Sequence, residues 1–118
     1  MSNIGIVHAT MVKEIATSIK DDLAHTILHA LPINSIYALA ALYEQDNQRA
    51  SDLAKKIGAQ ATSFTPTIDR LEALGLVERV PNANDRRAII ICLTKDGKTY
   101  KAAVQQAIGN AEVRYGGK

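Results

Sequence analysis

The sequence predicts a mainly helical domain of the α+β class, and two features of its hydrophobic pattern indicate this. Apolar side chains recur every three or four residues over most of the chain, as is typical of amphipathic helices. Two β-branched runs, LVERV at residues 76–80 and AIIICL at residues 88–93, interrupt that pattern. The 118 residues are enough for one domain with extra helices for assembly.

Two amphipathic helices are predicted at the N-terminal end, over about residues 8–30 and 33–45. Pro32 separates them, because a proline cannot continue a helix and restricts the residue before it. The apolar face of the first helix is formed by Met11, Ile15, Ile19, Leu23 and Ile27. The face of the second is formed by Ile36, Leu39, Ala40, Leu42 and Tyr43.

Two shorter helices follow, a third over residues 51–57 and a fourth within residues 60–74. Ser51 is a good N-cap for the third helix, and Gly58 and Gly75 are suited to end the third and the fourth. The fourth helix presents an apolar face formed by Phe64, Ile68, Leu71 and Leu74. Only a few residues join the two helices, as in a helix-turn-helix.

The two β-branched runs are separated by PNANDRR, which predicts a hairpin with a long tip. Thr94 can cap a last helix, and the final YGGK is expected to be a frayed tail. The apolar positions of that last helix are Tyr100, Ala103, Val104, Ala107, Ile108 and Ala111. A hairpin directly after a helix-turn-helix makes a winged helix. The expected parts are an N-terminal helix in 1–31, a winged helix-turn-helix in 32–97, and a C-terminal helix with its tail in 98–118.

The formal net charge is only +2, but the charges are unevenly distributed. Residues 1–48 carry two basic and five acidic side chains, whereas residues 49–118 carry twelve basic and seven acidic ones. The second part therefore suits a polyanion better than the whole-chain charge suggests. A solvated surface is the usual alternative explanation for such an imbalance.

The composition favours a soluble, cytoplasmic protein without membrane contact. The single cysteine, Cys92, excludes an internal disulfide and suits a reducing compartment. No apolar run approaches the roughly 18 residues of a membrane span, and the N-terminus does not resemble a secretory signal. Cys92 alternates with apolar neighbours on a predicted strand, which favours a small buried side chain over a redox sensor.

The stretch from Ser51 to Gly97 resembles the DNA-binding part of MarR-family transcriptional regulators. The similarity rests on Leu53-Ala54, on DRLE at 69–72 followed by GLVER at 75–79, and on the hairpin pattern Asp85, Arg87, Leu93, Thr94 and Gly97. It covers about residues 30–100. The resemblance implies a winged-helix regulator that binds double-stranded DNA and is expected to be a repressor.

In a helix-turn-helix the second helix enters the major groove, where side chains at its N-terminal end reach base edges. At the matching positions this chain has Gln60, Thr62, Ser63 and Thr65. Thr62 or Ser63 could instead only cap the helix, and a cap can also bind phosphate. Pro66 departs from the family, which often has a polar or basic residue there. It is expected in the first turn, with a helix that starts near Ser63 or bends there.

The two arginines at the predicted hairpin tip, Arg86 and Arg87, can reach the minor groove beside the recognition helix. Narrow A·T stretches of that groove concentrate negative potential and attract arginine. The resemblance implies that Asp85 pairs with the Arg87 guanidinium and fixes its direction. Outside this motif, two arginines on a loop would more often be solvated.

Further basic side chains are candidates for contacts with the phosphate backbone, which give salt-dependent affinity without sequence specificity. They are Arg49, Lys55, Lys56, Arg70 and Lys95. Arg70 has a structural alternative, because it can pair with Asp69 or Glu72 on the same helix.

The resemblance also implies a homodimer on a palindromic operator. The end helices, in residues 1–31 and 98–118, have more apolar surface than a small winged helix can bury, so we expect them to form the dimer interface. A further C-terminal helix, usual in the family's dimer lobe, is not expected here. Family members often bind small aromatic acids between the two lobes, where His29, Tyr37 and Leu42 would line the pocket.

Other functional classes have weaker support. No glycine-rich phosphate loop, nucleophile elbow or carboxylate pair indicates an enzyme, and no cofactor is expected. His25 and His29 stand four apart, a spacing that can hold a metal, but the only further ligands nearby are Asp21, Asp22 and His8. A solvated or interfacial histidine pair is the simpler interpretation. The alternative to a regulator is a winged helix that serves as a protein-interaction module, which would more often expose an apolar patch in place of the hydroxyls at 62–65.

Overall fold

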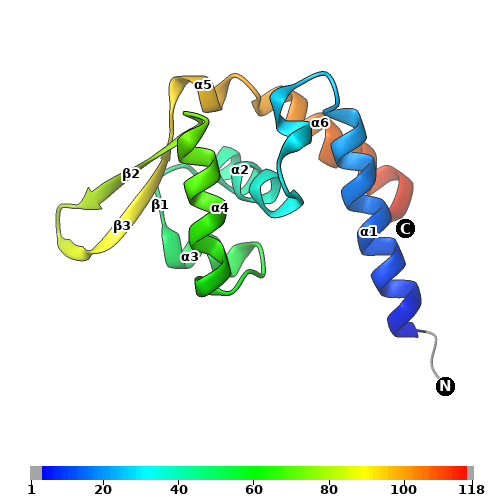
Figure 1. The fold of residues 1–118 in the computed structure, drawn as a ribbon, viewed down its shortest axis with the longest axis horizontal. Helices are drawn as coiled ribbons and strands as arrows, with labels where there is room; N and C mark the ends of the chain where they lie inside the picture. The colour runs from blue at the N-terminus through cyan, green and yellow to red at the C-terminus, as the bar shows by residue number, and fades with distance from the viewer. Residues whose placement is uncertain (1–3, 117–118) are drawn as a thin grey trace. The chain divides into compact units, whose positions relative to one another are not determined.

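The chain divides into two compact units, which are described separately (Figure 1). The first unit comprises residues 1–31 and 103–118, and the second comprises residues 32–102. The computed structural model describes the backbone of residues 4–116, and the side chains of that range except at positions 4–9, 61, 86 and 116. Over this described range, no helix is both long and apolar enough to cross a membrane.

The first unit is helical. It contains α1 (Ile4–Asp22), a short 3₁₀ helix (Ile27–Ala30), α6 (Lys101–Ala111), which begins in the second unit, and a turn of π-helix (Glu112–Gly116). Two side-chain hydrogen bonds join its parts. Asn110 Nδ2 donates to Asp22 Oδ2 at 3.0 Å, and Arg114 Nη1 donates to Ser18 Oγ at 2.8 Å. The buried apolar side chains are Ile19, Leu23, Leu28, Leu31, Val104, Ala107 and Ala111.

The prediction of one helix over residues 8–30 is wrong, because the chain turns between α1 and the 3₁₀ helix. Thr26 stabilises this turn. Its Oγ1 donates to the Leu23 carbonyl at 2.8 Å and accepts a hydrogen bond from the Leu28 backbone N–H at 3.1 Å. The side chain thus takes over hydrogen bonds that a continuing helix would make with its backbone.

The second unit is a winged helix, so the predicted fold class is confirmed. Its helices are α2 (Ile33–Glu44), α3 (Ala50–Lys56), α4 (Ala61–Ala73) and the short α5 (Lys95–Lys98). Its strands are β1 (Gln48–Arg49), β2 (Val77–Asn82) and β3 (Asp85–Leu93). They form one antiparallel sheet in the order β1-β3-β2. The largest fully buried side chains of this unit are Ile36, Leu39, Leu42, Leu53, Ile68, Leu71, Leu76, Val77 and Ile91.

β1 is a strand where the sequence indicated only a polar connection. Gln48 and Arg49 pair with the middle of β3, and the Gln48 side chain donates to two carbonyls at the end of α2, at 2.6 and 3.1 Å. Because β1 runs directly into α3, the helix begins at Ala50, and Arg49 occupies the N-cap position without a side-chain hydrogen bond. Ser51 therefore lies inside the first turn, and its predicted role as N-cap is wrong.

The hairpin of β2 and β3 differs from the prediction at its base and at its tip. Gly75 turns the chain with a φ of 74°, so that Leu76 is buried while Leu74, predicted to face inward, is 44% exposed. At the tip, Asn82 pairs with Asp85, which leaves a turn of two residues, so the predicted long tip is wrong. Both wing arginines belong to β3 instead.

The predicted cap at Thr94 is confirmed, but the helix after it is divided. Thr94 Oγ1 accepts a hydrogen bond from the Gly97 backbone N–H at 3.0 Å, as the N-cap of α5. That helix ends at Lys98, and α6 begins only at Lys101. Of the predicted frayed tail, residues 115–116 belong to the π-helical turn, and positions 117–118 lie outside the described residues.

Candidate nucleic-acid interface

α4 presents short polar side chains to solvent, while apolar side chains such as Phe64 are buried on its other face. The exposed side chains around its N-terminal end are Gln60, Thr62, Ser63, Thr65 and Pro66. The helix begins at Ala61, after Gln60 in the N-cap position, and Ser63 Oγ donates back to the Gln60 carbonyl at 3.1 Å. The interpretation that Thr62 or Ser63 serves as the N-cap is therefore wrong. Both lie within the first turn.

Pro66 lies in the second turn of α4 and not in the first, where it was expected. A proline has no backbone N–H, so the Thr62 carbonyl, four residues earlier, lacks the hydrogen bond that an α-helix normally supplies from that position. The helix nevertheless runs from Ala61 to Ala73 as one element, so the alternative start near Ser63 is wrong. Pro66 itself is exposed.

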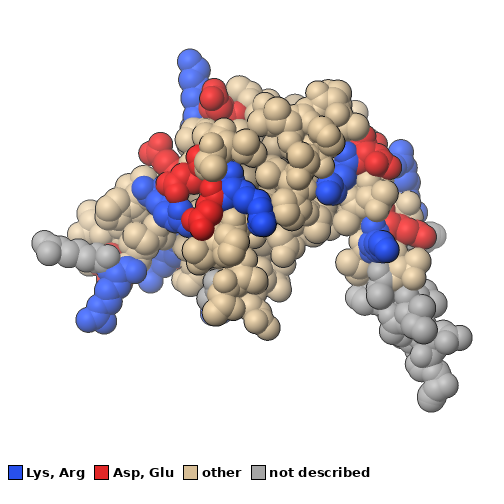
Figure 2. Space-filling view, in the orientation of Figure 1, with Lys and Arg blue, Asp and Glu red and all other residues tan. Residues whose placement is uncertain are grey.

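Arg79 of β2 connects the hairpin to α4. Its Nη2 lies 2.7 Å from Asp69 Oδ1, and its Nη1 donates to a Glu72 carboxylate oxygen. The hydrogen bond that Arg79 donates to Asp69 raises the pKa of the Arg79 guanidinium most, with burial acting against it and Glu72 adding to the rise. Figure 2 shows acidic and basic side chains in a mixed cluster over α4 and β2. This double ion pair fixes the base of the hairpin against the helix that carries the polar face.

Because Asp69 and Glu72 bind Arg79, the expected alternative in which Arg70 pairs with either carboxylate is wrong. The ion pairs of the described residues are those two, and Arg70 is exposed on α4. The other phosphate candidates on helices are also exposed: Lys55, Lys56 and Lys95. Arg70 and these lysines are therefore placed where a phosphate could reach them.

Thr94 and Gly97 also hold the base of the hairpin, where β3 ends beside the start of β2. Besides capping α5, Thr94 Oγ1 donates to the Gly75 carbonyl, and the Tyr43 hydroxyl donates to the Gly97 carbonyl at 2.6 Å. A side chain at position 97 would collide with the backbone carbonyl of Leu76. These contacts give a structural reason for the threonine and glycine in the hairpin pattern.

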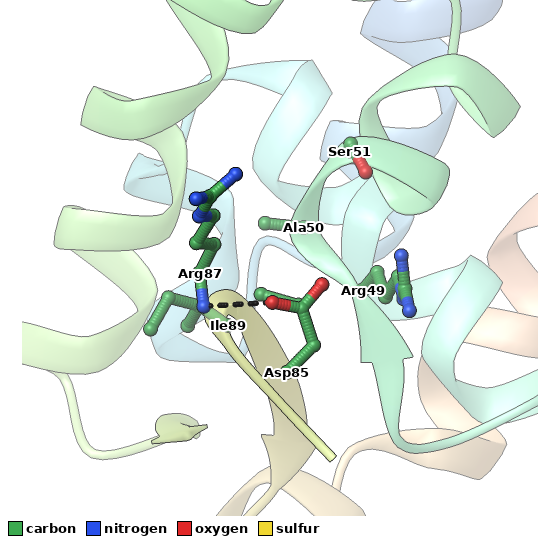
Figure 3. Close-up of a pocket in the computed structure, with 7 residues that line it drawn as sticks. Arg49, Ala50, Ser51, Asp85, Arg87 and Ile89 are labelled. Carbon is green, nitrogen blue, oxygen red and sulfur yellow. Dashed lines mark hydrogen bonds between the residues drawn. The ribbon is translucent and has the colours of Figure 1, made fainter. Parts of the chain in front are cut away.

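The wing strand β3 and the start of α3 border an open hollow of about 340 Å³ (Figure 3). It is lined by Arg49, Ala50, Ser51, Asp85, Arg87, Ala88 and Ile89. Arg49 and Arg87 are both exposed, so two strands that are distant in sequence bring two guanidinium groups to one surface. Ser51 and Asp85 belong to the same lining, so a hydroxyl and a carboxylate group accompany the two guanidinium groups.

Asp85 does not pair with the Arg87 guanidinium as expected. Its Oδ1 accepts a hydrogen bond from the Arg87 backbone N–H at 3.0 Å, and Figure 3 shows the Arg87 side chain running away from that carboxylate. An aspartate side chain commonly binds the backbone two residues later, which here fixes the start of β3. The Arg86 side chain lies outside the described part of the chain, so its role stays a prediction.

The three predicted effector residues are divided between the units. His29 lies in the 3₁₀ helix of the first unit, where its Nδ1 is 2.8 Å from the Thr26 carbonyl oxygen. Tyr37 and Leu42 lie on α2 of the second unit, and burial raises the pKa of Tyr37. Leu42 is fully buried in the core. The roles of His29, Tyr37 and Leu42 in an effector pocket stay predictions.

The histidines and the cysteine are placed differently from the expectation. His25 lies in the turn after α1, so it does not share a helix face with His29. Among the described residues, no group of three or more His, Cys, Asp or Glu side chains could hold a metal ion.

Cys92 is only partly buried. Burial, followed by the charges of Asp46 and Glu78, raises the pKa of its thiol, which disfavours the reactive thiolate.

The second unit is a winged helix. The second helix of its helix-turn-helix, α4, has an exposed polar face and lies beside a hairpin that carries an arginine. These features define a protein of the helix-turn-helix class. The profile of the MarR family matches residues 31–89, which is half of the chain. The chain belongs to this family, and the resemblance found in the sequence is confirmed.

Known relatives share this part of the chain. The uncharacterized HTH-type transcriptional regulator YfiV of Bacillus subtilis is 37% identical over 60 residues, which cover 51% of this chain and 38% of the relative. The HTH-type transcriptional repressor MdtR of the same species is 32% identical over 62 residues, 52% of this chain and 40% of the relative. The matching part thus spans about two fifths of each relative's length.

The fold extends the similarity beyond the matching sequence. A solved structure of reduced AbfR bound to DNA superposes with a TM-score of 0.79 at 23% identity, over 92% of this chain and 76% of that one. At this level of identity the likeness establishes the fold of the chain.

Proposed function

We propose that this chain is a cytoplasmic transcriptional regulator that binds double-stranded DNA sequence-specifically and catalyses no reaction. One observation supports this most directly. The exposed polar face of α4 is fixed, through Arg79, to a hairpin whose Arg87 borders the same hollow as Arg49. A major groove about 12 Å wide admits one α-helix, and the flanking backbone attracts such guanidinium groups.

In this proposal α4 lies in the major groove and the hairpin reaches the adjacent minor groove. The residues directed at base edges are Gln60, Thr62, Ser63 and Thr65, whose hydroxyl and amide groups both donate and accept hydrogen bonds. The wing contributes Arg86 and Arg87, with Asp85 holding the backbone between them. Arg49, Lys55, Lys56, Arg70 and Lys95 contact phosphates.

The regulator acts as a homodimer on a palindromic operator, with residues 1–31 and 98–118 forming the dimer interface. Two half-sites one helical turn apart then match the twofold symmetry of the protein. We propose a repressor, a role supported by the name of the relative MdtR. A dimer seated on a promoter would block access to it. A small aromatic acid is the predicted effector.

The test is DNA binding by fluorescence anisotropy on a random-sequence duplex, over a range of salt concentrations. The Arg86→Ala/Arg87→Ala variant is compared with Lys98→Ala/Lys101→Ala, which removes two positive charges from exposed positions outside the proposed DNA interface. Because these two lysines lie in a segment proposed for dimerisation, sedimentation first verifies that the control variant keeps the oligomeric state of the wild type. We expect the wing variant to bind more weakly, with a log–log salt slope shallower by about one to two, because each cationic side chain lost from the DNA surface neutralises about one phosphate charge less, which removes about 0.9 from the slope. The control variant should keep the wild-type slope.

If the wild-type chain does not bind DNA even at low salt, the regulator proposal fails. The protein-interaction module would then be the better interpretation, and retention on heparin would be weak and insensitive to salt. If both variants change the slope equally, DNA binding stands but the wing is not its specific contact.

A further inference from the structure

Pro66 occupies the middle of the exposed face of α4. The buried side chains Phe64, Ile68 and Leu71 define the inner face of the helix. At 3.6 residues per turn, the line opposite to them runs through Thr62, Pro66 and Ala73, and all three are exposed. In the proposed complex this outer line is the one that enters the major groove, so the Pro66 ring faces the base edges.

A proline at this position does not benefit the helix. It lies in the second turn, removes the hydrogen bond to the Thr62 carbonyl, and is the least favourable residue for a helix interior. The side chain is exposed, so packing of the core does not require it. Pro66 is thus unfavourable for the helix, exposed, and in the middle of a candidate site. A residue of this kind is expected to be present because the function of the protein requires it.

The chemistry of the ring differs from that of its neighbours. Thr62, Ser63 and Thr65 offer hydroxyl groups, which hydrogen-bond to any base edge and therefore discriminate weakly, and the two threonines add only one methyl group each. The pyrrolidine ring is apolar, has no donor and is rigid, so that ordering it on binding costs almost no side-chain entropy. The major-groove edge of DNA carries one apolar group, the C5-methyl of thymine, and apolar side chains contact it.

We propose that Pro66 is a specificity-determining residue, whose ring packs against the C5-methyl group of a thymine in each half-site. The inference rests on the proposed DNA-binding function and adds to it the base that the centre of α4 selects. Binding buries the methyl group and the ring together, so a base without that methyl group loses the contact.

The experiment uses the full chain and replaces thymine by deoxyuridine, which removes only the methyl group. A duplex is first selected from a random-sequence pool by the wild-type protein, and each thymine of a half-site is then replaced in turn. At one position we expect the wild type to bind about four-fold more weakly, the effect of one buried methyl group, and about fifteen-fold more weakly when both half-sites are changed.

Two variants show whether Pro66 is the cause. Pro66→Ser is expected to bind the thymine and deoxyuridine duplexes within about two-fold of each other, because serine offers no apolar ring. Serine is also a better helix residue than proline, so this variant should fold, which a thermal melt verifies. Ala73→Ser makes a similar apolar-to-polar change two turns along the same line and should keep the wild-type sensitivity to the methyl group.

The outcomes separate this inference from the proposed function. Wild-type binding that is insensitive to deoxyuridine at every position overturns the inference, as does a Pro66→Ser variant with undiminished sensitivity. In both cases DNA binding itself remains. If no duplex is selected and random DNA is not bound at low salt, the proposed function and this inference fail together.

Discussion

Gly97 is a residue at which the backbone leaves no room for a side chain. A Cβ at this position would collide with the Leu76 carbonyl, whose oxygen also accepts a hydrogen bond from the Thr94 backbone N–H at 3.1 Å. Because backbone cannot yield as a flexible side chain can, we expect Gly97→Ala to lower the free energy of unfolding by about 1–3 kcal/mol. Urea unfolding followed by circular dichroism measures this.

Gly109 provides the matched control within α6. An added Cβ there meets no atom within 4 Å, and alanine is the better helix residue, so Gly109→Ala should raise the free energy of unfolding by about 0.5–1 kcal/mol. Equal effects of the two substitutions would mean that the close approach at Gly97 does not constrain the fold.

Arg79 acts as a positioning residue more than as a source of stability. Asp69 and Glu72 are 60% and 43% exposed, so solvent screens both ion pairs, and Arg79→Met should cost only about 0.5–1 kcal/mol of unfolding free energy. Its effect on DNA binding should be larger, because the hairpin loses its link to α4. Anisotropy titrations and urea unfolding of the same variant compare the two effects.

The Asp69→Asn/Glu72→Gln variant distinguishes positioning from charge. It removes the same ion pairs but makes the chain more basic, which by electrostatics alone would strengthen DNA binding. If the ion pairs position the wing, this variant also binds DNA more weakly than the wild type. Stronger binding would show that only net charge matters at this place.

At the scale of elements, the sequence predicted the helices and strands whose pattern was local. α2 and α4 follow the 3.6-residue spacing of buried side chains, and the glycine at 75 and the threonine at 94 end and begin elements by backbone chemistry close in sequence. The order of elements then sufficed for the winged helix, because a hairpin after a helix-turn-helix has few other arrangements.

Elements that depend on distant partners were missed. β1 has two residues and exists because Gln48 and Arg49 pair with β3, some forty residues later. The break after α1 was hidden because Ile27 follows Leu23 at the four-residue spacing of the helix, although Ile27 is 48% exposed and Leu28 is the buried side chain after the turn. Length and periodicity of a segment cannot report either effect.

In the candidate site, too, the sequence predicted what depends on local pattern and missed what depends on distant partners. Exposure of the polar residues on α4 followed from its amphipathic pattern, whereas the partner of each charged group did not. Arg79 bridges Asp69 and Glu72, which lie ten and seven residues away on another element, and Asp85 binds a backbone N–H instead of a guanidinium. Opposite charges in one motif indicate an ion pair but do not say which groups form it.

At the scale of the whole molecule, the first unit exposes apolar side chains that the chain alone does not cover. Val12 on α1 is 49% exposed and Val113 after α6 is 81% exposed, and Met11, which precedes Val12 in the chain, is 39% exposed. These side chains belong to the segments proposed to form the dimer interface. A stable dimer normally buries 1,200 Å² or more, largely apolar at its centre.

We therefore expect Val12→Lys/Val113→Lys to shift the chain from dimer to monomer, because four lysine side chains would have to be buried or displaced across a twofold interface. Sedimentation equilibrium at several concentrations measures the shift. Leu74→Lys is the control, since Leu74 is an exposed leucine of the second unit outside those segments and its substitution should leave the dimer intact.

DNA binding should follow assembly. The double variant is expected to keep its affinity for a single half-site but to lose the additional affinity that a palindromic duplex gives the wild type, because one monomer contacts only one half-site. A double variant that remains dimeric would contradict the proposed interface, and the second unit would then be the place to look for the contact between protomers.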